Sequence, residues 1–216
     1  MNHLDVQTGY WDSVAFEKAF SHPVPLSTFR DMFSLTARIL DYGCGYGRVC
    51  SQLVDAGYRN VIGIDISRKM VERGRDLDGR LDLRTFQGIP TEFVPGSFDL
   101  CLLLTVLTCR PSEDGQKKTI SEVHRLLRPG GFLFVSDLPL QTDERNQNRY
   151  HEFEKEFGTF GVFRTEEAVV RHHDMKWVHQ LLSAFDIVAR DGVKVMTMNG
   201  HEANAFQVLA RKRSTG

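Results

Sequence analysis

The chain has 216 residues and a formal net charge of −1, with 25% charged and 41% hydrophobic residues. This length fits one domain with a full core, and the balanced charge without a basic patch argues against a nucleic-acid partner. The most apolar segment, residues 100–107, has only the length of a core strand, so we expect no membrane span.

Residues 1–37 precede the predicted core. Their first residues are polar and lack the apolar region of a signal peptide, so we expect a cytoplasmic protein. The sequence His-Pro-Val-Pro at 22–25 interrupts any helix, because proline cannot donate the helical hydrogen bond. Apolar residues at helical spacing before and after this interruption predict two short helices.

Residues 38–48 read Arg-Ile-Leu-Asp-Tyr-Gly-Cys-Gly-Tyr-Gly-Arg. An apolar run ends at Asp41, three alternating glycines follow, and an amphipathic segment starts at Arg48 and ends before Gly57. This order predicts a strand, a tight turn and a helix over 48–56. Alternating glycines permit positive φ and let a ligand approach the backbone, and the helix start offers free N–H groups.

The turn differs from the dinucleotide-binding pattern in two respects. Its spacing is G-x-G-x-G rather than G-x-G-x-x-G, and Asp41 stands before the first glycine. A carboxylate there would repel a pyrophosphate, but it suits a ligand that carries an ammonium and a sulfonium group.

The next predicted strand covers residues 60–66 and is apolar on both faces, as in parallel sheets covered by helices. It contains Asp65 near its end, a position from which a carboxylate can accept both hydroxyls of a ribose. Ser67 then caps a helix that continues to about Leu77.

The alternation of strands and helices continues through the middle of the chain. We expect strands at 81–86, 100–104 and 132–136, and a helix at 112–128 that is stopped by Pro-Gly-Gly at 129–131. Thr105 falls at the carboxyl end of its strand, where open α/β sheets bind ligands.

Residues 138–173 depart from this pattern. We expect a helix within 141–155 and then a β-hairpin, with arms at 158–164 and 168–172 around Thr165-Glu166-Glu167. Such an insertion would lie above the carboxyl edge of the sheet as a lid. A helix at 174–184 and strands at 185–190 and 205–210 complete the chain, with 193–197 extending the first of these strands.

The strings at 40–47 and 63–67 closely resemble motifs I and II of class I S-adenosylmethionine (SAM) methyltransferases. Ser-Phe-Asp at 97–99 and Leu-Leu-Arg-Pro-Gly-Gly at 126–131 are also typical of this family, and the resemblance covers residues 36–140. It implies one α/β domain over 1–216. This domain has a Rossmann-like, mostly parallel seven-stranded sheet with an antiparallel last strand, helices on both faces, and a lid after strand five.

The resemblance also implies SAM as the cofactor and indicates where it binds. The implied SAM-binding residues in the core are Asp41, Gly43, Gly45, Arg48, Asp65, Ile66 and Thr105. From the N-terminal segment, which folds over the cofactor in similar enzymes, Tyr10 and Trp11 are candidates. Most relatives carry an acidic residue after strand three to bind the adenine amino group, whereas this chain has Gln87, Gly88 and Ile89, whose amide and backbone groups are the alternatives.

Methyl transfer is a displacement at carbon, so a base helps only when the nucleophile must lose a proton. Because histidine titrates near neutrality, His151, His172 and His173 are the candidate bases. Arg149, Tyr150 and Arg164 are instead candidates to orient a carboxylate or phenolate of the substrate.

We therefore expect a SAM-dependent methyltransferase that acts on an oxygen, nitrogen or carbon of a small-molecule acceptor. One alternative enzyme would let a nucleophile attack a different carbon next to sulfur and would release methylthioadenosine. A non-catalytic SAM-binding regulator is disfavoured by the intact Asp41, Gly43, Gly45 and Asp65. The four cysteines show no metal-binding spacing, so no metal is expected, and the sequence is compatible with a homodimer.

Overall fold

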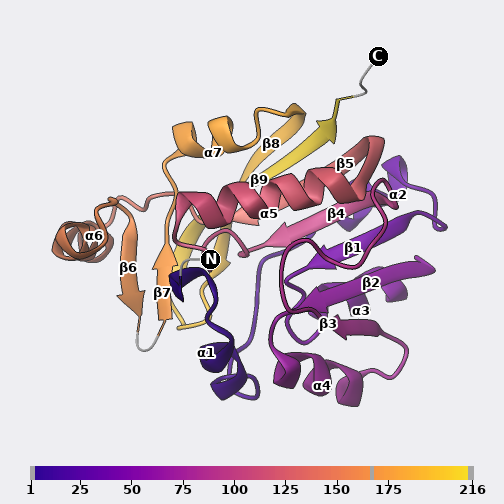
Figure 1. The fold of residues 1–216 in the computed structure, drawn as a ribbon, viewed down its shortest axis with the longest axis horizontal. Coiled ribbons are helices and arrows are strands. Elements are labelled where there is room, and N and C mark those ends of the chain that lie inside the picture. Colours follow the sequence, from indigo (N-terminus) through magenta and orange to yellow (C-terminus); the bar gives the residue numbers. More distant parts are fainter. Residues whose placement is uncertain (1–2, 166–167, 214–216) are drawn as a thin grey trace.

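A seven-stranded sheet forms the centre of the protein in a computed structural model that describes residues 3–165 and 168–213 (Figure 1). The strand order is β3-β2-β1-β4-β5-β9-β8. Five parallel strands come first along the chain: β1 (Arg38–Tyr42), β2 (Asn60–Asp65), β3 (Asp82–Thr85), β4 (Phe98–Leu104) and β5 (Leu127–Asp137). The last strand, β9 (Glu202–Lys212), runs antiparallel between β5 and β8 (Phe185–Met196). The predicted fold class is confirmed.

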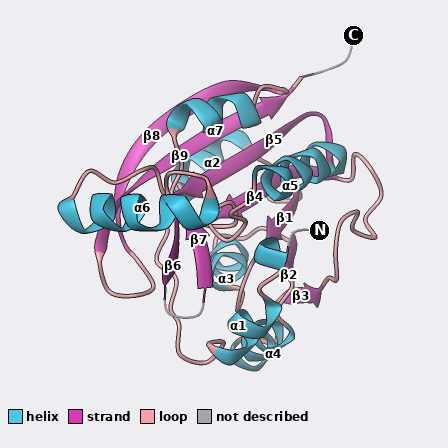
Figure 2. Cartoon of the chain, turned by 60° about the vertical axis from the view of Figure 1, so that its left-hand side comes forward, coloured by secondary structure: helices cyan, strands magenta, loops and turns pink. Residues whose placement is uncertain are grey.

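Helices cover both faces of this sheet (Figure 2). They include α3 (Arg48–Asp55), α4 (Arg68–Leu77), α5 (Glu113–Leu126) and α7 (Met175–Leu181). Neighbouring residues of β1 point to opposite faces, so Ile39 belongs to the core beneath α3 and Leu40 to the core beneath α5 and α7. Both side chains are fully buried, which explains the continuous apolar pattern of the central strands.

Several element boundaries differ from the sequence prediction, and strand pairing explains two of the differences. The helix expected over 112–128 ends at Leu126, because Leu127 already pairs with Phe98 as the start of β5. The segments at 185–190 and 193–197 form one strand, β8, because β9 pairs with it along its length. Ser67 and Ser112 cap α4 and α5 by accepting backbone N–H groups, the first as predicted.

Two further parts lie at the edge where the parallel strands end (Figure 1). At this edge the N-terminal cap contains the 3-10 turn η1 (His3–Asp5) and α1 (Thr8–Ser13), whereas its last helix, α2 (Leu26–Met32), packs on the face of the sheet through Phe29, whose ring meets that of Phe134. The lid contains α6 (Glu144–Phe157) and the antiparallel pair β6 (Val162–Thr165) and β7 (Ala168–Arg171). The predicted turn residues Glu166 and Glu167 lie outside the described residues. Within residues 3–165 and 168–213, no helix is both long and apolar enough to cross a membrane.

Candidate functional site

The glycine turn between β1 and α3 forms one end of a cavity at the carboxyl edge of the sheet. Gly43 and Gly45 have φ angles of +77° and +55°, a conformation that side chains with a Cβ rarely adopt. A Cβ on Gly43 would come within 2.6 Å of the Val106 side chain, and one on Gly45 within 2.6 Å of the Phe20 ring. The Gly43 N–H donates to the carbonyl of Ile64 at 2.7 Å, so the turn is tied to β2. Both glycines are therefore required by their surroundings.

Two carboxylates line the same end of the cavity, Asp41 from β1 and Asp65 from β2. Asp65 accepts the N–H groups of Gly45 and Ser67, each at 2.8 Å. Asp41 is 2% exposed, and its hydrogen-bond contact among the described residues is the weak one from the Cys50 thiol at 3.5 Å. Burial raises the pKa of Asp41 to about 7, and it also raises the pKa of Asp65.

Beyond Asp65, Ile66, Phe86 and Tyr42 line an aromatic part of the cavity. The rings of Tyr42 and Phe86 meet edge to face with centroids 5.1 Å apart. The Tyr42 hydroxyl is buried and has no hydrogen-bond partner among the described residues. Residues 87–89, the sequence candidates for the adenine contact, do not line this cavity, and their role stays a prediction.

The N-terminal cap supplies a third wall through Trp11, Phe20 and His22. The carbonyl oxygen of His22 accepts a hydrogen bond from Nη2 of Arg48 at 2.5 Å, which ties this wall to the first turn of α3. Tyr10 lies behind Trp11, with ring centroids 4.9 Å apart, and does not line the cavity. Of the two aromatic candidates near the start of the chain, the structure therefore brings Trp11 to the site.

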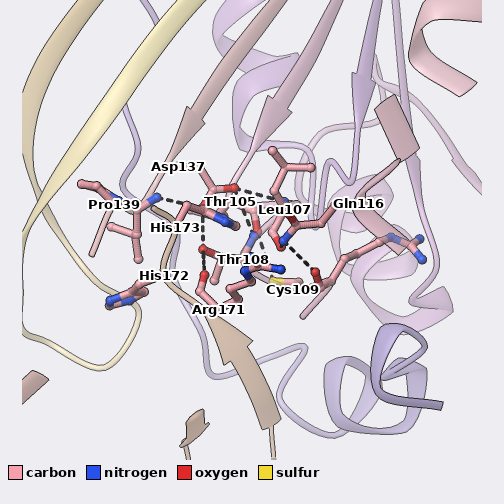
Figure 3. A network of polar contacts seen from close by, with 12 residues as sticks. Thr105, Leu107, Thr108, Cys109, Gln116, Asp137, Pro139, Arg171, His172 and His173 are labelled. Carbon is pink, nitrogen blue, oxygen red and sulfur yellow. Dashed lines mark hydrogen bonds and ion pairs between the residues drawn. The ribbon is translucent and has the colours of Figure 1, made fainter. Parts of the chain in front are cut away.

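Asp137, the last residue of β5, holds together the segments at the carboxyl edge (Figure 3). Its carboxylate accepts the N–H groups of Leu107 and Thr108 at 3.0 and 3.2 Å and the Thr108 hydroxyl at 2.5 Å, and it lies 3.5 Å from Nε2 of His173. Burial opposes ionisation, but the contacts with His173 and Thr108 outweigh it and hold the pKa of Asp137 below its usual range. Asp137 thereby fixes the loop in which Thr105, a cavity residue, has a φ of +56°.

The three histidines predicted as bases occupy different environments. His173 is buried against Asp137 and does not line the cavity, and His151 is exposed on α6 beside Phe160. His172 does line the cavity, but burial and the nearby Arg149 lower its pKa to about 3. The positions of His151 and His173 therefore give no support to a catalytic role, and the low pKa argues against His172 as a base.

Arg149 and Arg145, one helical turn apart on α6, both line the cavity. The Arg149 guanidinium lies 3.7 Å from the centre of the Phe163 ring, and its Nη2 donates to the side-chain oxygen of Asn146. Burial lowers the pKa of Arg149, and its Nε is buried without a partner among the described residues. This predicted substrate-binding residue therefore faces the cavity.

The other two predicted substrate-binding residues do not reach the cavity. Tyr150 is fully buried behind the cavity wall, and its hydroxyl lies 2.5 Å from Nδ1 of His172. Arg164 is exposed and pairs with Glu156 on α6. We expect Tyr150 to act only through His172, and Arg164 to lie outside the site because its charge is already paired at the surface.

A single cavity joins these walls and encloses about 1500 Å³, counting the open space at its mouth. Because the glycine turn and the lid line the same cavity, a nucleoside cofactor at the turn and an acceptor at the lid would lie next to each other. Part of its lining escaped the sequence analysis: Phe20, His22, Tyr42, Arg145, Phe163, Val170, Met196, Met198 and His201. Tyr42 lies within the glycine motif itself, but no local pattern marks the others, because they approach the glycine turn only in the folded chain.

Comparison with known proteins gives a family match for the central part of the chain. Residues 40–135, which contain the glycine turn, Asp41 and Asp65, match a protein family described as "Methyltransferase domain". A solved SAM-dependent methyltransferase from Methanosarcina mazei superposes with a TM-score of 0.83, covering 89% of this chain and 99% of that one. The two share 22% sequence identity, so this likeness concerns the fold.

The names of two similar proteins state their activities. The chain is 32% identical over 142 residues to 27-O-demethylrifamycin SV methyltransferase from Amycolatopsis mediterranei, an alignment of 61% of this chain with 50% of that protein. It is 25% identical over 160 residues to the O-methyltransferase resE from Aspergillus sclerotiorum, with 68% and 60% covered. The chain thus spans about half of the first relative and three-fifths of the second.

Proposed function

Since residues 40–135 belong to the methyltransferase-domain family and the fold is that of class I SAM-dependent methyltransferases, we propose that this chain methylates an oxygen of a small-molecule acceptor. The observation that carries the proposal is the continuous cavity, with the glycine turn and two carboxylates at one end and the lid at the other. The two similar proteins named above methylate oxygen according to their names, which supports oxygen as the accepting atom.

SAM is the cofactor of this family and fold, and the residues at the glycine turn fit it. Asp41 lacks a strong hydrogen-bond donor, so a ligand with an ammonium and a sulfonium group would stabilise its charge. Asp65 is oriented by two backbone N–H groups and retains lone pairs for ribose hydroxyls. Because Gly43 and Gly45 have no Cβ, the side chains of Val106 and Phe20 can pack directly against the turn between these carboxylates.

We expect positioning and exclusion of water to supply most of the catalysis. Bound SAM supplies a methyl group on a positively charged sulfur. The chain contributes Trp11 and Phe20 from the cap and Phe163 from the lid, which would shield the reacting atoms from water. Thr105 offers a cavity hydroxyl at the carboxyl end of β4, although that hydroxyl donates to the carbonyl of Leu104 at 2.7 Å.

The proposal is tested by incubating the protein with SAM and a fractionated metabolite extract and analysing the products by mass spectrometry. We expect S-adenosylhomocysteine (SAH) together with an acceptor heavier by one methylene, and neither product from Asp65→Ala. Methylthioadenosine in place of SAH would contradict methyl transfer and indicate attack on another carbon next to sulfur.

A further inference from the structure

The lid end of the cavity differs in charge from the glycine-turn end. The carboxylates that line the cavity are Asp5, Asp41 and Asp65, and none comes from residues 138–165 or 168–173. The lid instead contributes Arg145 and Arg149, and neither has a carboxylate within ion-pair distance among the described residues. The glycine-turn end thus combines two carboxylates with Arg48, whereas the described residues of the lid contribute arginines and no carboxylate, which suits the lid end to an anion.

Arg149 is held in place without an ion pair among the described residues, and Asp143 attracts it only from beyond ion-pair distance. It packs on the Phe163 ring at 3.7 Å, and the N–H groups not used by Asn146 remain for a ligand. Partial burial of a guanidinium without an anion costs free energy, because it removes hydrating water whose hydrogen bonds the protein does not replace. Its planar fork matches a carboxylate, which can accept two parallel hydrogen bonds.

The hydrogen bonds around Tyr150 determine which nitrogen of His172 carries the proton. The Tyr150 oxygen accepts the backbone N–H of Gln141 at 3.1 Å, and Nδ1 of His172 at 2.5 Å is the acceptor that the described residues offer to the hydroxyl proton. The low pKa keeps the imidazole neutral, and the proton of the ring then lies on Nε2. Because Nδ1 faces Tyr150 behind the wall, Nε2 is the ring nitrogen left for the cavity, where it acts as a donor.

Arg149 and His172 approach the same side chain, Phe163, from different elements. The ring centroids of His172 and Phe163 are 4.9 Å apart, and the Arg149 guanidinium lies 3.7 Å from the centre of the same Phe163 ring. Thr165, at the end of β6, adds a buried hydroxyl without a partner among the described residues. The neighbouring wall offers apolar contacts from Val170, from Met196 at the end of β8 and from Met198 in the turn after it. The polar residues that line the cavity beside these methionines are Thr197, Asn199 and His201.

We propose that the acceptor is an amphipathic carboxylic acid whose carboxylate binds Arg149 and Nε2–H of His172, while its apolar body packs against the lid and the β8–β9 turn. This inference rests on the proposed function, because it assigns the substrate class of the same cavity. It also gives His172 a role in substrate binding in place of the base role expected from the sequence.

The test compares carboxylates with neutral amides of the same shape. SAH-saturated protein is titrated at pH 7.5 with three matched pairs, namely 2-naphthoate and 2-naphthamide, cinnamate and cinnamamide, and octanoate and octanamide. We expect the acid of at least one pair to bind about tenfold or more tightly than its amide, as a charge-assisted bidentate contact would give. Equal binding of acid and amide in all three pairs would overturn the inference.

Variants of Arg149 test whether this lid residue causes the preference for carboxylates over amides. Arg149→Gln should reduce the affinity for the acid to that for the amide, and Arg149→Lys should keep part of the preference, since it retains charge without the fork. Lys155→Gln removes a charge from the exposed side of the same helix and should change nothing. A preference that survives in Arg149→Gln would contradict the assignment. SAH binding to each variant reports that the cavity is still folded.

Two results separate this inference from the proposed function. Failure of SAH itself to bind would contradict both, whereas SAH binding without any preference for acids would contradict the inference alone. In ¹⁵N-resolved spectra the ring of His172 should be protonated on Nε2 and should not titrate between pH 5 and 8. Titration of His172 near the ordinary histidine pKa of about 6.5 would overturn its assignment as a neutral donor.

Discussion

Asp41 is the residue whose surroundings most directly reveal the ligand of the cavity. The sequence places a carboxylate before the glycines, and the structure adds that this carboxylate is nearly inaccessible and receives only a thiol contact. Such a group destabilises the empty protein, because a buried carboxylate without strong donors resists ionisation. A cationic ligand that binds beside Asp41 removes this destabilisation. The carboxylate therefore lowers the folding stability of the empty protein and raises its affinity for the ligand.

We predict that Asp41→Asn stabilises the ligand-free protein at pH 8 by about 1–3 kcal/mol and weakens SAM binding about tenfold or more. The native pKa of about 7 lies above that of the unfolded carboxyl group. The wild type therefore gains stability as the pH falls from 7 towards 4, and the advantage of the variant shrinks there. Urea unfolding at pH 8 and pH 5, with calorimetric SAM titration, measures both effects.

Asp31→Asn on the exposed side of α2 is the matched control and should leave stability and affinity unchanged. If Asp41→Asn destabilises the protein at pH 8, or binds SAM as the wild type does, the role given to this carboxylate is wrong.

The chemistry at single residues could be predicted only where it depends on neighbours in sequence. Asp41, Gly43 and Gly45 follow from their spacing, since one turn contains all three. His172 has the residue type of a base, but its pKa depends on its burial and on the nearby Arg149. The position of its ring proton depends on the hydrogen bond with Tyr150. The sequence does not show those contacts.

At the level of secondary-structure elements, Asp137 connects three segments. Its carboxylate accepts N–H groups from the loop after β4 and from Leu138 after its own strand, and it lies 3.5 Å from Nε2 of His173 after β7 (Figure 3). The loop after β4 carries the left-handed Thr105, a conformation that costs a β-branched residue about 1–3 kcal/mol and persists only when its surroundings hold it. One carboxylate therefore links the cofactor side of the cavity to the lid.

We predict that Asp137→Asn lowers the free energy of unfolding by about 2–4 kcal/mol, because an amide group would face backbone donors and leave them unpaired. Hydrogen exchange at the amides of Leu107 and Thr108 should accelerate more than in the rest of the sheet. Asp191→Asn on the exposed part of β8 is the control. Unchanged stability together with unchanged exchange at 107–108 would rule out this connecting role.

The order of strands and helices was largely predictable, because each central strand is an apolar run bounded by turn residues. The boundaries were less so. Helix α5 stops at Leu126 although Pro129 was the expected stop, because pairing with Phe98 draws Leu127 into β5. The sequence predicted two separate strand segments at 185–190 and 193–197, yet β8 pairs with β9 from Phe185 to Met196, with one register shift between Ile187 and Ala189.

On the scale of the whole molecule, the cavity is built by parts that are far apart in the chain. The resemblance in sequence covers residues 36–140, and the family match covers 40–135, so both describe the cofactor end. The lid, the cap and the β8–β9 turn supply the other walls (Figure 1). Their contacts were not predictable because they join residues such as Phe20, Gly45 and Met198 across the fold. This division explains why the cofactor is evident from the sequence and the acceptor is not.

The most direct measurement of the central claim is a calorimetric titration of the purified protein with SAM and with SAH. The account predicts saturable binding of one equivalent of each ligand, with an affinity at least about tenfold lower in Asp65→Ala, since Asp65 is held by Gly45 and Ser67 to accept the ribose hydroxyls. No heat with either ligand, or equal affinities in the wild type and Asp65→Ala, would contradict it.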